Sequence, residues 1–174
     1  MLRPLLIASA ASLALAACAT DGDMAASATA AGDMTPNQRT AYVQMAAASD
    51  LYEIQSSQLA MSQAQSADVR AFAQMLMEHH TATSQQVAAA ATAAGTPPSP
   101  TLMPMQAKMI AQLQAANGAA FDRIFISQQV QAHTMALALH SSYASNGDTP
   151  SLRTVAAAAA PVVRQHLERA KTLR

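Results

Sequence analysis

Residues 67 to 100, ADVRAFAQMLMEHHTATSQQVAAAATAAGTPPSP, decide the fold. Alanine recurs through this stretch, and alanine has the best helix propensity of all residues. No glycine or proline occurs between Pro36 and Gly95, so the pattern predicts helices up to that point. The run GTPPSP at 95–100 then ends the helical pattern, because prolines cannot continue a helix.

Outward from this break, the sequence predicts four long helices and one short one. Ser66 is a suitable N-cap, so we split the region before Gly95 into two helices. Thr149 and Pro150 are a cap and first-turn pair that starts the last helix. The expected helices span 37–64, 67–94, 102–116, 119–145 and 151–173. Because no strand-like alternation persists, we expect an all-α antiparallel four-helix bundle with a short additional helix.

One proline lies inside an expected helix. Pro161 falls within 151–173, where it removes a backbone hydrogen bond. We expect either a kink at this position or a break into two shorter helices.

The N-terminal residues have the pattern of an export signal. Arg3 precedes an apolar run from Leu5 to Leu15, which is too short to span a bilayer stably. The ending Leu15-Ala16-Ala17-Cys18 resembles the lipobox of bacterial lipoproteins, in which the cysteine receives diacylglycerol. An ordinary cleaved signal is the alternative, because Ala17-Cys18-Ala19 also has small residues at the required positions.

These features predict the domain organisation and the location of the chain. We expect a signal peptide at 1–17, the lipidated Cys18 with a flexible tether at 18–36, and the bundle domain at 37–173. The lipid on Cys18 would hold the protein on the membrane, and we expect the periplasmic face of the outer membrane. A soluble periplasmic protein is the alternative.

Composition excludes several functional classes. Ten basic residues balance ten acidic ones, so nucleic-acid binding is not expected. The single cysteine allows no internal disulfide. No phosphate-binding glycine loop, nucleophile elbow or cysteine-based zinc site occurs, so we expect a non-enzymatic accessory or binding role in the cell envelope. The sequence identifies no protein partner.

Histidines and carboxylates are distributed over all four long helices. Bundles build metal sites from side chains that project inward from facing helices. The hypothesis that competes with the accessory role is therefore a metal-binding or metal-dependent redox protein with a transition metal ion as cofactor. Its expected ligands are Glu53, His80, His133 and His166, with Asp122 orienting one imidazole.

The same residues also have a purely structural interpretation. Buried carboxylates and imidazoles can hydrogen-bond one another or backbone carbonyls in an alanine-rich core, with no metal present. His79 and His140 are expected to be solvated.

Methionine is abundant, with eleven residues in the chain. We interpret Met75, Met77, Met103, Met105 and Met109 as core packing, because they occur at helical spacings. Thioether sulfur also prefers monovalent copper, which leaves a copper site as the alternative. A third possibility is that the short helix around 103–109 docks a partner.

Four stretches together resemble a known family of exported bacterial proteins, domain of unknown function 4142. They are AASDLYEIQSSQLA (47–60), VRAFAQMLMEHHT (69–81), FDRIFISQQVQAH (121–133) and APVVRQHL (160–167). The resemblance implies a ferritin-like four-helix arrangement. The residues of this chain that match the polar positions of the family pattern are Glu53, His80, Asp122, His133 and His166. In the family pattern an aspartate commonly stands where this chain has His79. The doubled Glu-x-x-His of di-iron ferritins is missing, so the resemblance does not imply ferroxidase activity.

Overall fold

The computed structural model describes residues 36–173, and helices make up most of this part of the chain. The expected signal peptide, Cys18 and nearly all of the tether lie outside the described residues. The helices are α1 (Arg39–Gln63), α2 (Ala67–Ala93), α3 (Pro104–Gln114), α4 (Gly118–Asn146) and α5 (Pro150–Thr172). Each begins and ends within two residues of its prediction. The five predicted helices are thus confirmed, and no strand occurs within 36–173.

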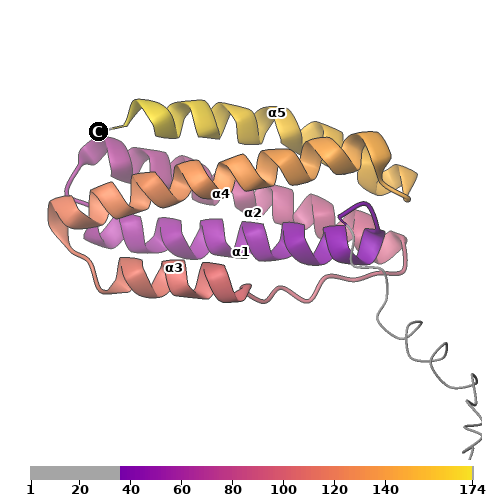
Figure 1. The fold of residues 1–174 in the computed structure, drawn as a ribbon, viewed down its shortest axis with the longest axis horizontal. Coiled ribbons are helices and arrows are strands. Elements are labelled where there is room, and N and C mark those ends of the chain that lie inside the picture. The colour runs from indigo at the N-terminus through magenta and orange to yellow at the C-terminus, as the bar shows by residue number, and fades with distance from the viewer. Residues whose placement is uncertain (1–35, 174) are drawn as a thin grey trace, which may run out of the picture. The chain divides into compact units, whose positions relative to one another are not determined.

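The four long helices form an antiparallel bundle (Figure 1). Helix α1 packs on α2 and α4, and α5 packs on the same two helices. A hydrogen bond from Ser142 to Asn37 joins the end of α4 to the start of α1, so these neighbours also run in opposite directions. The segment from α2 to α4 contains α3 and returns along the bundle, so the predicted fold class is confirmed. None of the helices in 36–173 is long and apolar enough to cross a membrane.

Local signals explain where α2 begins and ends. The Ser66 side chain accepts a hydrogen bond from the Val69 N–H at 3.5 Å, as an N-cap does. At the other end Gly95 has a φ of +73°, a conformation that glycine adopts without strain. The Gly95 N–H donates to Thr92 O, and the Thr96 N–H donates to Ala91 O, so the last carbonyls of α2 are satisfied.

Pro161 does not divide the last helix. Helix α5 is continuous from Pro150 to Thr172, so the expected break into two helices is wrong. Pro161 is exposed, whereas Ala159 and Val163 on either side of it are buried. Packing of these neighbours against the bundle holds both halves of α5 in one helix despite the missing hydrogen bond.

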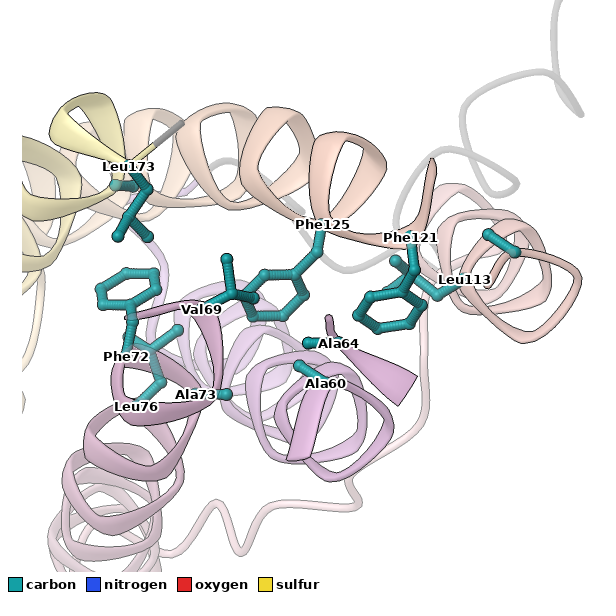
Figure 2. Close-up of a cluster of buried hydrophobic side chains, with 12 residues drawn as sticks. Ala60, Ala64, Val69, Phe72, Ala73, Leu76, Leu113, Phe121, Phe125 and Leu173 are labelled. Carbon is teal, nitrogen blue, oxygen red and sulfur yellow. The ribbon is translucent and has the colours of Figure 1, made fainter. Parts of the chain in front are cut away.

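Two of the three apolar clusters of the core are separated along the helices by a polar layer. One cluster surrounds Phe72, Phe125 and Leu173 at the end where α2 begins (Figure 2). The other surrounds Tyr42 and Tyr143, whose rings stack with centroids 3.9 Å apart. Between them lie the buried side chains that we call the polar layer: Asp50 and Glu53 on α1, His80 on α2, His133 on α4 and His166 on α5. The two clusters therefore hold this polar layer at mid-height of the bundle.

Candidate metal centre

Three imidazoles from three helices converge in the polar layer. His80, His133 and His166 are all buried, and each offers one ring nitrogen within 4.8 Å of those of the other two. Their ring centroids are 5.3 to 5.6 Å apart. Residues separated by more than thirty positions in the sequence thus form one compact group of nitrogen donors.

Asp50 orients the first of these imidazoles. The Nδ1 of His80 lies 2.8 Å from Oδ1 of Asp50, and both side chains are buried. Because a carboxylate accepts this hydrogen bond, Nδ1 carries a proton, and in the neutral form of the ring the lone pair is on Nε2. The Nε2 of His80 is buried and has no hydrogen-bond partner among the protein atoms of 36–173. A buried polar atom without a partner is rare in native proteins, and a bound ion or water is one partner that would satisfy it.

His133 and His166 belong to a chain of hydrogen bonds that reaches the surface. His133 Nδ1 donates to the backbone oxygen of Gln129 at 2.9 Å, which leaves Nε2 with a lone pair. This Nε2 lies 3.3 Å from Nδ1 of His166, and Nε2 of His166 lies 2.8 Å from Nδ1 of His79. His79 is exposed, so a continuous path of imidazoles connects solvent with the polar layer.

Glu53 lies beside the three imidazoles. It is 1% exposed, and its Oε1 is 3.7 Å from Nδ1 of His133. Its Oε2 has no hydrogen-bond partner among the described residues. Burial raises the pKa of Glu53 to about 7, although the nearby charge of His80 opposes this effect. A carboxylate in this position can compensate positive charge in the layer.

The local environment keeps two of the imidazoles neutral. Burial, followed by the positive charge of His80, lowers the pKa of His133 to about 3 and that of His166 to about 3. Burial also lowers the pKa of His80, but the Asp50 hydrogen bond and the Glu53 carboxylate outweigh it, so the pKa is raised. Neutral imidazole is the form that binds metal ions. His133 and His166 are therefore neutral, whereas His80 gives up a proton first when it is charged. Before Nε2 of His133 binds an ion, its hydrogen bond with Nδ1 of His166 has to break.

The structure places two of the expected residues differently. Asp122 accepts hydrogen bonds from the backbone N–H groups of Gln65 and Ser66 at 3.0 and 2.9 Å, so it holds the α1–α2 turn and orients no imidazole. His140 is 3% exposed and lies 3.1 Å from the hydroxyl oxygen of Tyr42, so the expectation that it is solvated is wrong. Tyr42 comes from α1, and this contact across helices removes His140 from solvent. His79 is exposed, as expected.

Sequence reasoning missed Asp50. It lies three residues before Glu53, which places both carboxylates on one face of α1. That spacing was the available signal, because a second buried acid one turn from Glu53 requires a partner of opposite charge.

The arrangement is suitable for binding a transition metal ion. Three imidazoles leave the remaining coordination positions open for a water molecule or an anion, and imidazole binds copper, zinc, iron and nickel. A metal-binding imidazole is usually oriented by a hydrogen bond from its other ring nitrogen. His80 has such a bond to Asp50, and His133 has one to the backbone carbonyl of Gln129.

The chain belongs to the family described as a domain of unknown function, DUF4142, whose pattern matches residues 23–173. No curated protein of described function matches the sequence. Among solved structures, the chain is similar to "CopM in the Cu(II)-bound form", with 17% identity and a TM-score of 0.66, covering 77% of this chain and 93% of that one. It is likewise similar to CopM in the Ag-bound form (16%, TM-score 0.63) and in the Cu(I)-bound form (16%, TM-score 0.64), with the same coverage. At this identity the likeness establishes the fold alone.

Proposed function

We propose that this protein binds a transition metal ion in the bundle core. His80, His133 and His166 would be the ligands, and Asp50 would position His80. One observation carries the proposal: three buried imidazoles from three helices place ring nitrogens within 4.8 Å of one another, and the buried Nε2 of His80 has no protein partner. Glu53 and Asp50 are the buried carboxylates beside these imidazoles that would compensate the charge of the ion.

Divalent copper is the first candidate. Among divalent first-row ions, Cu²⁺ binds nitrogen sites most strongly. The similar bundle of CopM has been solved in copper-bound and silver-bound forms, which supports a coinage metal for this fold. Zinc is the alternative, because a site of three histidines with an open position also suits Zn²⁺.

Titration of the purified full-length protein with Cu²⁺ tests the proposal. The protein is prepared without a histidine tag, and binding is followed by competition with a chelator and by electron paramagnetic resonance. We expect one tightly bound Cu²⁺ with nitrogen coupling in the wild type and none in His133→Gln. His140→Gln is the matched control, since it removes a buried imidazole outside the group of three. Equal binding by wild type and His133→Gln, or none by wild type, would contradict the proposal and favour the purely structural interpretation.

We further propose that the bundle acts as a non-enzymatic accessory of the cell envelope, attached through lipid on Cys18. This rests on the lipobox-like sequence before Cys18. Two or three acyl chains on one cysteine hold a protein durably, whereas one chain does not. Expression with a labelled fatty acid should give a labelled, membrane-associated protein, and Cys18→Ser should abolish both. An unlabelled wild-type protein in the soluble periplasmic fraction would contradict the lipid anchor.

A further inference from the structure

A second feature of the bundle is a pocket lined by methionines. It lies between α1, α3 and α4 and has a volume of about 120 Å³. Five of the eleven methionines in the chain line it: Met45, Met103, Met105, Met109 and Met135. They come from three separate parts of the sequence, so the fold brings them together.

Core packing does not explain all of these methionines. Met109 is buried, but Met105 is 42% exposed and Met135 is 50% exposed. Within 36–173 only one other large apolar side chain, Met61, is exposed. The interpretation of Met105 as a core residue is therefore wrong. Exposing these two apolar side chains to water costs free energy. A ligand bound in the pocket would offset this cost.

The chemistry of the pocket lining favours a soft, singly charged ion. Thioether sulfur is a neutral, polarizable donor that prefers Cu⁺ over hard divalent ions. No charged residue lines the pocket, so nothing there compensates the second charge of a divalent ion. The amide nitrogen of Gln131 lies 4.0 Å from the sulfur of Met105, so this sulfur of α3 lies close to α4.

The pocket is separate from the polar layer. Ser49 and Ala132 line the pocket, whereas the next residue in each helix, Asp50 and His133, belongs to the polar layer. Successive residues of a helix point about 100° apart, so α1 and α4 present different faces to the two sites.

We propose that this pocket is a binding site for a monovalent soft metal ion, Cu⁺ or Ag⁺, held by thioether sulfurs. The pocket is independent of the imidazole site. Binding of Cu⁺ or Ag⁺ in the pocket neither requires nor excludes binding of Cu²⁺ by the imidazoles. Met105 on α3 and Met135 on α4 are the exposed donors, and Met109 on α3 is a buried one.

Titration with Ag⁺ tests the site, because Ag⁺ is a soft monovalent ion that does not change oxidation state in air. The full-length double variant Met105→Leu and Met135→Leu keeps the side-chain volume and removes two sulfurs. We expect it to bind at least one equivalent of Ag⁺ fewer than wild type, or to bind that equivalent at least tenfold more weakly. The matched control is Met61→Leu with Met77→Leu, which removes two sulfurs outside the pocket.

Methyl NMR identifies the donors directly. In the wild type, Ag⁺ should shift the methionine methyl signals of the pocket residues and leave those of Met61 and Met77 in place. His133→Gln should keep this Ag⁺ response, which separates the pocket from the imidazole site. Unshifted pocket methyl signals, or equal Ag⁺ binding by wild type and the pocket variant, would overturn the proposal.

Discussion

The Asp50 carboxylate accepts the Nδ1–H of His80, so in the neutral ring Nε2 is the nitrogen that has the lone pair. A carboxylate in this position also raises the basicity of the imidazole, and such partners typically change metal affinity 10- to 100-fold. The negative charge of Asp50, rather than its shape, is the property that matters for an incoming cation.

Asp50→Asn is therefore expected to weaken Cu²⁺ binding by roughly tenfold or more while the fold is retained. The physical reason is that an amide oxygen can still orient the ring but no longer polarises it. Competition titration measures the affinity, and circular dichroism checks the helical content. Glu78→Gln is the matched control, because it removes an exposed carboxylate from the same helix as His80. Equal affinities of the two variants would refute a role for Asp50.

His140 makes folding sensitive to acid. Burial, with the positive charge of His80, lowers the pKa of His140 from 6.5 to about 4. Between these values the unfolded chain binds a proton that the folded chain does not, so stability is complete above about pH 6.5 and is lost as the pH falls towards 4. The total loss from this one group is up to about 3 kcal/mol, at about 1.4 kcal/mol per pH unit.

Urea unfolding of metal-free protein between pH 4 and 7 measures this contribution. His140→Gln should flatten the pH dependence by nearly one proton, while Tyr42→Phe, which removes only the hydroxyl partner, should leave most of it. The pKa values of His133 and His166 are lowered as well, so both residues also make the protein less stable at acidic pH. Both are present in the two variants, so their contribution does not change. A pH dependence unchanged by His140→Gln would show that His140 is already accessible to protons in the folded state.

The individual site residues differ in how far the sequence could predict them. Glu53, His80, His133 and His166 are all buried, and their distribution over the four long helices is what the sequence shows of this group. His140 follows His133 by seven residues and so lies on the same side of α4, but its hydrogen-bond partner Tyr42 is 98 positions away. Contacts of that kind depend on which helices are neighbours, and no local pattern encodes this.

Asp122 connects three helices at the end of the bundle where α2 begins. It lies in the first turns of α4, and both carboxylate oxygens accept backbone N–H groups of the α1–α2 turn. Those N–H groups have no partner inside a helix, so the carboxylate satisfies donors that would otherwise be buried or weakly solvated.

Asp122→Ala should lower the free energy of unfolding by about 2 kcal/mol, because hydrogen bonds to a charged group are lost. Chemical denaturation measures this loss. The exposed Asp68, in the first turn of α2, is the control, and Asp68→Ala should cost only about 0.5 kcal/mol. The Cu²⁺ affinity of Asp122→Ala should match that of wild type, and a selective loss of metal affinity would instead place Asp122 in the metal site.

The helices themselves were the most predictable part of the structure. Local signals in the sequence mark several helix ends, namely Ser66, Gly95 and Pro150. In the structure α2 begins after Ser66 and ends before Gly95, and α5 begins at Pro150. The side on which α3 packs was not predictable, since its apolar residues would suit any neighbouring groove. The methionine pocket follows from that packing, and for this reason it was invisible in the sequence.

Across the bundle, the imidazole group contains one residue each from α2, α4 and α5, and Asp50 adds a contact from α1. A metal ion bound there would link α2, α4 and α5 through coordinate bonds, in addition to the packing and hydrogen bonds that already join the helices. The same layer contains buried polar atoms without hydrogen bonds, on Asp50, Glu53 and His80 among others, and each of these has a free-energy cost in the metal-free protein.

The metal-free protein should therefore be less stable than the metal-bound form by an amount that grows with metal concentration. At a free Cu²⁺ concentration one hundred times the dissociation constant, binding should add about 2.7 kcal/mol to the free energy of unfolding. Thermal unfolding with Cu²⁺ and with excess chelator measures the difference. His133→Gln should abolish the metal-dependent increase, whereas His140→Gln should retain it because His140 lies outside the three-imidazole group. A Cu²⁺-dependent increase that persists in His133→Gln would locate the stabilising ion elsewhere, and the methionine pocket is the next site to test by the Met105→Leu and Met135→Leu variant.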